Sequence, residues 1–509
     1  MSGKPTRLDA RSLRDLVLDA DSWQTWDTPV VRPEVSPEYA AELADAAEKS
    51  RQDESIITGE GRLRGRRVAV VAGEFGFLAG SIGVAAAERL ISAVERATEE
   101  GLPLLAAPVS GGTRMQEGTV AFLQMIGITA AIARHKEAGL PYLVYLRHPT
   151  FGGVLASWGS LGHVTIAEPG ASIGFLGPRV YEALYGEPFP AGVQTAEHLA
   201  EHGLIDAVVA HEEIAEVADR ALRVLAARQT WHVDVGAAER PGPEDGTDAD
   251  DPEDHRSAWD VITASRRPDR PGVRGLLRAA ATDVVGLSGT GAGEKDPGLL
   301  LALARFGGAP CVVLGQDRRG QSLSAPLGPA ALREARRGMH LAEQLRLPLV
   351  TLIDTPGAAL SREAEEGGLA AEIARCLHDM VLLRAPTLAV LLGQGTGGGA
   401  LALVPADRVL AAANGWLGPL PPEGASVIIH RDTDHAGEMA AAQGVRATDL
   451  WRAGIVDRVV PERPDAADEP QQFCLRLGRV LGEELAGLLG RDDNERYRSR
   501  LHRYRHLGR

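Results

Sequence analysis

The sequence contains only three cysteines, Cys311, Cys376 and Cys474, among its 509 residues. They are too few and too scattered for a disulfide framework or a four-cysteine zinc module. Such sparse cysteine is typical of a protein from a reducing compartment. We therefore expect neither a disulfide nor a metal ion to hold this chain together.

Aromatic and basic residues are also in short supply. Aromatics make up 4% of the chain, which leaves few side chains on which nucleic-acid bases could stack. The 54 lysines and arginines are outnumbered by 69 aspartates and glutamates, so the net charge is -15. The chain as a whole lacks the positive charge that attracts a phosphate backbone. These two shortages argue against nucleic-acid binding.

Long hydrophobic runs are missing. The longest apolar stretch, residues 119–133, is shorter than the roughly 20 residues that cross a bilayer and contains Gln124. We predict that it is a buried core helix. Residues 1–21 mix charges with single leucines and lack the apolar segment of a signal peptide. We therefore expect a cytoplasmic protein that does not bind membranes.

The length of the chain is sufficient for two or three domains. An acidic segment rich in proline and glycine, residues 236–256, separates two halves of similar length. Such a composition cannot bury enough apolar surface to fold, so we predict a linker there. The predicted organisation is an N-terminal extension over 1–55, a first domain over 56–235, the linker, and a second domain over 257–509 that ends in a helical tail.

The two halves are similar to each other at a nearly constant spacing. Pro103 and Pro348 precede matching apolar runs, and Pro141 and Pro386 do the same; both pairs are 245 residues apart. The similarity extends over five segments and slips by six residues only near its end, at the segments that begin with Gly203 and Gly454. Because chance would not keep this register, we infer an internal duplication.

Each half alternates short apolar runs with longer segments of helical period, which predicts a layered α/β unit. The expected buried strands are 68–72, 104–107 and 143–146. The expected helices are 84–99, 118–136, 336–345 and 369–383.

A glycine corner occurs in each half, as TFGGVLAS at 150–157 and TGGGALAL at 396–403. In both, an expected strand runs into glycines and then into an expected helix of small residues. Such a corner presents backbone N–H groups at a helix N-terminus with no side chain in the way, which suits it to stabilise a negatively charged oxygen. Donors of this kind typically accelerate a reaction by about 100- to 1000-fold each. The alternative is that the glycines only permit close packing, but a matched pair favours two oxyanion sites.

Other motif matches are incomplete. Residues 393–398 fit a dinucleotide-binding fingerprint, yet no acidic residue follows at the required spacing. Residues 354–357 are similar to a GTPase switch motif, but the chain has no phosphate-binding loop that ends in Gly-Lys-Ser/Thr. The remaining candidates for a catalytic base are isolated histidines, which are more typical of surface or core positions: His148, His163, His340 and His378.

The motifs of both halves resemble the carboxyltransferase of bacterial acetyl-CoA carboxylase. Three segments of the first half are similar to its beta subunit: ITGEGR at 57–62, SGGTRMQEG at 110–118 and AEPGASIGFLGPR at 167–179. Three segments of the second half are similar to its alpha subunit: TLIDTPGA at 351–358, GGGALA at 397–402 and PEGAS at 422–426. The resemblance covers about residues 23–462 apart from the linker, so the chain looks like a fusion of the two subunits.

This resemblance implies two crotonase-like domains, each a ββα superhelix, and transfer of a carboxyl group from carboxybiotin to an acyl-CoA. It implies that Gly152 and Gly153 polarise the thioester carbonyl, and that Gly399 and Ala400 hold the biotin ureido oxygen. Forming an enolate and cleaving carboxybiotin place charge on two oxygens, which agrees with two corners. The freed biotin nitrogen can take the substrate proton, so no side-chain base is required.

Further contacts follow from the resemblance. The turn at 110–114 is expected beside the CoA arm, with Arg114 either at a phosphate or in a surface ion pair. Leu401 and Ala402 are expected to shape the space for the acyl tail or biotin, or else to be plain core. The expected substrate-binding residues are Gly111, Gly112, Arg114, Gly398, Leu401 and Ala402.

Two departures from the family pattern stand out. Residues 1–55 contain no cysteine, so the zinc ribbon common in the beta subunit is absent from them. The segment AALSR at 358–362 replaces a loop that contains proline and glycine in the alpha subunit. Because of the second departure, a catalytically silent scaffold remains an alternative.

We expect a carboxyltransferase that makes malonyl-CoA from acetyl-CoA for fatty acid biosynthesis. Because the sequence contains no Met-Lys-Met biotinylation motif and no ATP-binding glycine loop, biotin is expected on a separate carrier protein that works with a biotin carboxylase. A homo-oligomer, dimer or hexamer, is expected, with each site formed between a beta-type half and an alpha-type half of a partner subunit. The alternatives are a malonate decarboxylase-like enzyme and a catalytically silent scaffold.

Overall fold

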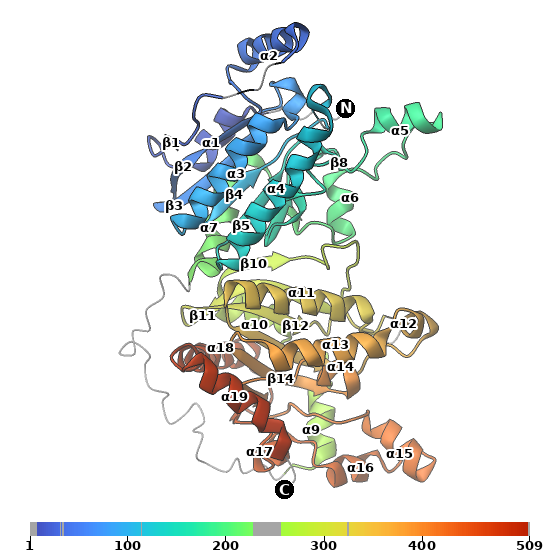
Figure 1. Ribbon diagram of the computed structural model, residues 1–509. Coiled ribbons are helices and arrows are strands. Elements are labelled where there is room, and N and C mark those ends of the chain that lie inside the picture. The colour runs from blue at the N-terminus through green and yellow to red at the C-terminus, as the bar shows by residue number, and fades with distance from the viewer. Residues whose placement is uncertain are drawn as a thin grey trace. The chain divides into compact units, whose positions relative to one another are not determined.

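The computed structural model describes residues 8–30, 32, 35–112, 114–227, 256–322 and 325–506. The chain forms two compact units (Figure 1). The first consists of Met1–Ala226 with Gly291–Gly293, and the second of Ala227–Thr290 with Glu294–Arg509. The expected linker, 236–256, lies outside the described residues apart from Arg256.

The first unit is built on a seven-stranded sheet with the order β1-β2-β3-β4-β5-β7-β9. Pairing is antiparallel from β1 to β3 and parallel from β3 onward. Its strands are β1 (Gln24–Thr25), β2 (Ile56–Leu63), β3 (Arg66–Gly73), β4 (Leu104–Ala107), β5 (Tyr142–Leu146), β7 (Val164–Ala167) and β9 (Ala207–Val208), and a separate pair is formed by β6 (Thr150–Phe151) and β8 (Ile173–Gly174).

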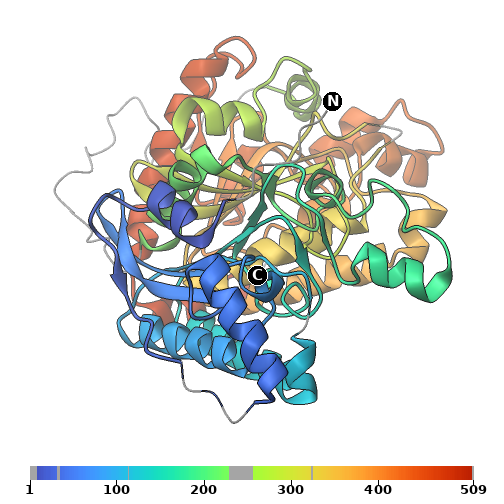
Figure 2. The ribbon, with the colours of Figure 1, turned by 90° about the horizontal axis from the view of Figure 1, so that it is seen from above.

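Helices such as α3 cover this sheet because they present an apolar stripe toward it. Two long helices, α3 and α4, lie side by side in both ribbon views (Figures 1 and 2). The helices of the unit are α1 (Ala10–Val17), α2 (Pro37–Ser50), α3 (Val84–Glu99), α4 (Gly118–Glu137), α5 (Pro178–Tyr185), α6 (Ala196–Glu201) and α7 (Ile214–Leu225).

The second unit repeats this plan, with a seven-stranded sheet ordered β10-β11-β12-β13-β14-β15-β16. Its strands are β10 (Thr282–Leu287), β11 (Leu299–Phe306), β12 (Ala309–Gln316), β13 (Leu349–Thr355), β14 (Thr387–Gly395), β15 (Arg408–Ala412) and β16 (Arg458–Val460). Its helices are α9 (Ala258–Ser265), α10 (Val273–Ala280), α11 (Pro329–Leu345), α12 (Arg362–Glu366), α13 (Leu369–Leu382), α14 (Gly397–Leu401), α15 (Pro422–His430), α16 (Ala436–Gln443), α17 (Ala447–Arg452), α18 (Pro470–Leu489) and α19 (Asp493–Arg503).

The two sheets share strand order and pairing direction, which confirms the α/β class and the internal duplication. The expected helix 84–99 has the bounds of α3, and the expected strand 104–107 has those of β4. The other expected elements are present with ends that differ by a few residues, apart from α11, which begins at Pro329 rather than residue 336.

The apolar stretch 119–133 forms most of α4, but the prediction that this helix is buried was wrong. Ile128 and Ile132 face the core, whereas Val120, Phe122 and Ile126 on the first half of the helix are exposed. The second half of this apolar run therefore has a buried stripe, and its first half has an exposed apolar face.

The segment before residue 56 is built into the first unit. Strand β1 adds to the edge of the sheet beside β2. Helix α1 packs against β3 and α7 and buries Leu13 and Val17. Its first residue, Ala10, donates a backbone hydrogen bond to Glu74 Oε2 at 2.8 Å. Residues 8–55 thus supply one strand and two helices rather than an unstructured extension.

Across the residues that the structure describes, none of the helices combines the length and the apolar character needed to cross a membrane.

Candidate active site

The glycine corner of the first unit follows the short strand β6. Gly152 has φ +69°, a left-handed conformation that glycine adopts without strain. Its N–H donates to the carbonyl of Phe175 at 3.0 Å and lies 3.3 Å from that of Gly174. This N–H is therefore occupied, so the expected role of Gly152 as an oxyanion donor does not fit the structure.

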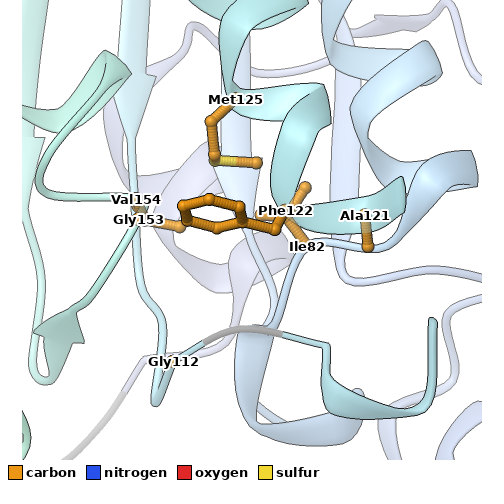
Figure 3. Close-up of a pocket in the computed structure, with 7 residues that line it drawn as sticks. All are labelled: Ile82, Gly112, Ala121, Phe122, Met125, Gly153 and Val154. Carbon is orange, nitrogen blue, oxygen red and sulfur yellow. The ribbon is translucent and has the colours of Figure 1, made fainter. Parts of the chain in front are cut away.

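Gly153 is the next residue, and its position differs. Its N–H donates to no group among the described residues, and neither does that of Val154. Both residues line a small pocket, together with Ile82, Gly112, Ala121, Phe122 and Met125. Figure 3 shows the Phe122 ring between Gly153 and Ile82, with the Met125 side chain above it. Gly153 and Val154 are thus the donors that the first corner offers to a ligand.

The glycine corner of the second unit joins β14 to the short helix α14. Gly397 has φ +64°, and its N–H donates to the carbonyl of Gly418 at 2.9 Å. Gly398 and Gly399 follow in the first turn of α14, where N–H groups have no partner within a helix. Ala400 is buried as the fourth residue of the helix. Just before the corner, Thr396 Oγ1 is buried and makes no hydrogen bond within the described part of the chain.

Strand pairing shows which residues of the two corners are equivalent. Thr150 pairs with Ser110 in the first unit, and Gly395 pairs with Thr355 in the second. Both steps correspond to a spacing of 245, so Gly152 is equivalent to Gly397 and not to Gly398. Aligning the letters of the two corners from Thr150 and Thr396 would be off by one residue, because the backbone aligns the left-handed glycines instead.

A buried glutamine side chain is hydrogen-bonded to the backbone of the second corner. Gln316, the last residue of β12, is fully buried, and its Nε2 donates to the carbonyl oxygen of Gly399 at 2.8 Å. Its Oε1 accepts a hydrogen bond from the backbone N–H of Asp354 at 3.1 Å. The amide thus connects the end of β13 to the first turn of α14. Sequence analysis missed Gln316, because nothing in its local pattern distinguishes it from a polar residue at a strand end.

Asp354 is a second buried polar residue that the sequence did not single out as part of this site. Its Oδ1 accepts from the backbone N–H of Gln394 at 3.2 Å, and Arg318 Nε lies 3.4 Å from its Oδ2. Burial raises the pKa of Asp354, and the nearby Arg318 charge opposes that effect. Asp354 therefore ties β13 to β14 directly below the second corner.

The turn at 110–114 was expected beside the CoA arm. In the structure the Gly111 N–H donates to the carbonyl of Ala79 at 2.8 Å, and that of Gly112 donates to Ser110 Oγ at 3.1 Å. Both groups are occupied within the turn. Gly112 still lines the pocket beside Gly153, so it shapes that pocket through its backbone and lack of a side chain.

Arg114 lies inside the first unit rather than on its surface. Its side chain is fully buried and forms a 2.7 Å ion pair with Glu54, which is also fully buried. It further donates to Ser81 Oγ at 2.7 Å and to the Tyr39 hydroxyl at 3.0 Å. A group enclosed in this way cannot meet a CoA phosphate, and the pair is not the surface pair considered as the alternative.

Leu401 and Ala402, which follow the glycines of the second corner, have different surroundings. Ala402 is fully buried, which agrees with the core alternative. Leu401 has 48% of its surface exposed and can still contact a ligand.

No group of three or more His, Cys, Asp or Glu side chains that could hold a metal ion is found where the structure describes the chain.

Comparison with known proteins identifies the family to which these corners belong. Residues 6–485 match the family model described as a carboxyl transferase domain. The chain is 61% identical over 503 residues to a probable biotin-dependent acyl-coenzyme A carboxylase beta3 subunit of Mycobacterium tuberculosis, and the match covers 99% of both chains. It is 34% identical to the acetyl-coenzyme A carboxylase carboxyl transferase subunits beta/alpha of Saccharopolyspora erythraea, over 99% of this chain and 89% of the relative.

Solved structures share the fold at lower sequence identity. A transcarboxylase 12S crystal structure, described as a hexamer with hydrolyzed methylmalonyl-coenzyme A bound, matches with TM-score 0.71 and 21% identity, over 93% of this chain and 90% of that one. A single-chain, multi-domain long-chain acyl-CoA carboxylase matches with TM-score 0.67 and 19% identity, over 94% of this chain and 46% of that one. These likenesses confirm the expected crotonase-like fold.

The chain therefore belongs to the carboxyl transferase family, which confirms the resemblance inferred from its motifs. Within that family it is a biotin-dependent carboxyltransferase of the acyl-CoA carboxylase type.

Proposed function

We propose that this protein transfers the carboxyl group of carboxybiotin, presented by a separate carrier protein, to acetyl-CoA and so produces malonyl-CoA. The observation that carries the proposal is the unpartnered N–H pair of Gly153 and Val154 at the edge of a small pocket. A thioester oxygen placed there would receive two hydrogen bonds as it gains negative charge on the way to an enolate.

The shape of the pocket supports a short acyl chain. Phe122 and Met125 stand next to Gly153 and leave little free space beside it (Figure 3). The relative from Saccharopolyspora erythraea is named for acetyl-coenzyme A. An acyl group beside Gly153 would contact both side chains, and a long chain would have to displace them, so the narrow pocket favours a short chain.

The second corner is proposed to receive the biotin ureido oxygen. Gly398 and Gly399 lie in the first turn of α14, and the buried Thr396 hydroxyl beside them makes no hydrogen bond to a described group. The N–H groups of a helix's first turn lack partners within the helix, which suits this corner to a negatively charged oxygen. The expected donors Gly399 and Ala400 remain part of this proposal.

We also propose that the working enzyme is a homo-oligomer. Helix α5 projects from the first unit in both ribbon views (Figures 1 and 2). It and the strand end before it expose the apolar side chains Phe175, Leu184 and Tyr185. An exposed cluster of this kind is typical of a protein interface. Light scattering combined with size-exclusion chromatography should show a dimer or a hexamer rather than a monomer.

The test is turnover in the reverse direction. The protein is incubated with malonyl-CoA and free biotin or biotinylated carrier, and acetyl-CoA is measured. In the forward direction, acetyl-, propionyl- and long-chain acyl-CoA are compared with the carrier and a biotin carboxylase. We expect acetyl-CoA to give the highest kcat/KM.

Two variants connect the activity to the first corner. Gly153→Val places methyl groups in the pocket and should lower turnover by at least about 100-fold. Gly286→Val is the matched control, because Gly286 lies in β10 with open space around its Cα. Release of CO2 from a malonyl thioester without any biotin acceptor would instead identify a decarboxylase. Normal assembly without turnover under any of these conditions would identify a silent scaffold.

A further inference from the structure

We infer that Gln316 is a positioning residue for the second glycine corner, where its side-chain amide fixes the orientation of the Gly399–Ala400 peptide. This inference rests on the proposed function, because it concerns the donors offered to the biotin ureido oxygen. The Gln316 side chain contacts the backbone of the corner, so it affects the reaction through that backbone.

The hydrogen bonds determine which way the Gln316 amide faces. Its acceptor atom, Oε1, receives the backbone N–H of Asp354 at 3.1 Å, which only an oxygen can do. The opposite atom, Nε2, must then face Gly399, and it lies 2.8 Å from the Gly399 carbonyl oxygen. Since both ends are engaged and the side chain is fully buried, the amide cannot turn without breaking both bonds.

The Gly399 carbonyl requires an outside donor because α14 is too short to supply one. In a longer helix, the Leu403 N–H would donate to Gly399. Here the Leu403 N–H donates to the carbonyl of Ala400 at 3.0 Å, and the Ala402 N–H donates to that of Gly398, also at 3.0 Å. The carbonyl between them has Gln316 as its donor.

Fixing this carbonyl fixes a donor. A trans peptide is planar, so the C=O of Gly399 and the N–H of Ala400 point in opposite directions. As Gln316 holds the carbonyl toward the end of β12, the Ala400 N–H is held away from it. The Gly399 N–H is attached to the same α-carbon as the Gly399 carbonyl group, so its direction is constrained as well.

The first unit offers an internal comparison. Ile56 pairs with Gly73 at the end of β3, as Leu299 pairs with Gln316 at the end of β12. The position equivalent to Gln316 is therefore a glycine without a side chain. In that unit the carbonyl of Val154, the counterpart of Gly399, accepts from the backbone N–H of Gly159 at 2.9 Å, within its own turn. The connection through Gln316 is thus specific to the corner proposed to face biotin.

The experiment compares Gln316→Met with Thr351→Val in the full-length protein. Gln316→Met retains the volume but removes both hydrogen bonds. Thr351→Val is the matched control, because Thr351 is equally buried on the neighbouring strand and its hydroxyl donates to the carbonyl of Leu403 at 2.8 Å, beyond the C-terminal end of α14 and away from its first-turn N–H groups. Transfer from malonyl-CoA to biotin and thermal unfolding are measured for each.

We expect both variants to lose stability, Gln316→Met more because it removes two hydrogen bonds, but only Gln316→Met to lose much activity. Misplacing a catalytic donor by about 1 Å costs on the order of 100-fold in rate, so kcat of Gln316→Met should fall by roughly that factor. KM for the acyl-CoA should stay within about twofold, because the acyl-CoA is proposed to bind at the first corner. A kcat for Gln316→Met within about threefold of the Thr351→Val value would overturn the inference.

Gln316→Glu provides an independent readout that also serves if the methionine variant does not fold. An ionised carboxylate has no proton for the Gly399 carbonyl, whereas a protonated one can donate as the amide does. The kcat of Gln316→Glu relative to wild type should therefore rise as the pH is lowered from 8 to 6. A ratio that does not change with pH would contradict the positioning role. An inactive wild-type protein in the same assay would refute the proposed function instead.

Discussion

The buried pair of Arg114 and Glu54 leads to a prediction that separates stability from substrate binding. Replacing Arg114 by methionine fills a similar space but removes the positive charge. Glu54 would remain in the interior, where an unpaired carboxylate is strongly unfavourable. The sequence placed Arg114 either at a CoA phosphate or in a surface ion pair, whereas the structure makes it the partner of Glu54 at 2.7 Å, with neither side chain exposed.

The size of the loss can be worked out from the contacts. Removing one partner of a buried ion pair costs about 3–5 kcal/mol. Glu54 keeps a second partner, because Arg32 lies 2.8 Å from its Oε2 and is only partly exposed. We therefore expect the lower end of that range, about 3 kcal/mol. For a unit of about 200 residues, each kcal/mol corresponds to roughly 2–4 °C in Tm, so the first unit should melt about 6–12 °C lower.

The assay combines scanning calorimetry with kinetics at a temperature where both proteins are folded. KM for acetyl-CoA should stay within about twofold of the wild-type value. Arg220→Met is the control, because Arg220 and Glu216 form a 2.5 Å pair that is largely exposed in the same unit. Loss of that pair should cost less than about 1 kcal/mol. An unchanged Tm together with a tenfold higher KM for Arg114→Met would refute the structural role and restore the phosphate contact.

Three further predictions follow from individual residues. Gly152→Ala should lower the free energy of unfolding by about 1–2 kcal/mol, because φ is +69° at this position. Gly153→Ala should leave the free energy of unfolding nearly unchanged, since its added Cβ would lie 3.4 Å from Met125 Cγ. Urea unfolding measures both changes. Burial raises the pKa of Glu334 from its ordinary 4.5 to about 7, so the folded state retains its proton longer than the unfolded state. The free energy of unfolding should then fall by up to about 3 kcal/mol between pH 4.5 and 7, and the difference from Glu334→Gln, measured by urea unfolding across that range, should show this loss. Burial also raises the pKa of every cysteine thiol, so Ellman's reagent should label the native protein slowly and label three thiols after unfolding: Cys311, Cys376 and Cys474.

The fold was accessible from sequence because its signals are local and repeated. Helix α3 follows an apolar stripe of helical period that begins after Gly83, and strand β4 is a four-residue apolar run that follows Pro103. The spacing of 245 residues then carried these assignments from one unit to the other. The exposed face of α4 could not be predicted from the sequence, because an apolar run without a polar side does not show which side faces solvent.

The site was accessible only in outline, because its details depend on backbone conformation and distant partners. The letters of the two glycine corners suggested matched donors, but left-handed φ angles at Gly152 and Gly397 shift the true equivalence by one residue. Arg114 meets Glu54 across 60 positions of sequence, and Gln316 meets Gly399 across 83. No local pattern indicates a contact of that range.

The duplication explains why the two corners are alike in one feature and different in another. Each begins with a left-handed glycine whose N–H is bonded to a following segment, as Gly152 is to Phe175 and Gly397 to Gly418. That bond sets the direction in which the chain leaves the strand and enters the next turn. The residues that follow are not constrained by it, so their carbonyls can be held locally or by a distant amide such as that of Gln316. A shared turn with separate supports allows the geometry of one corner to change without altering the other, which a protein with two chemically different substrates requires.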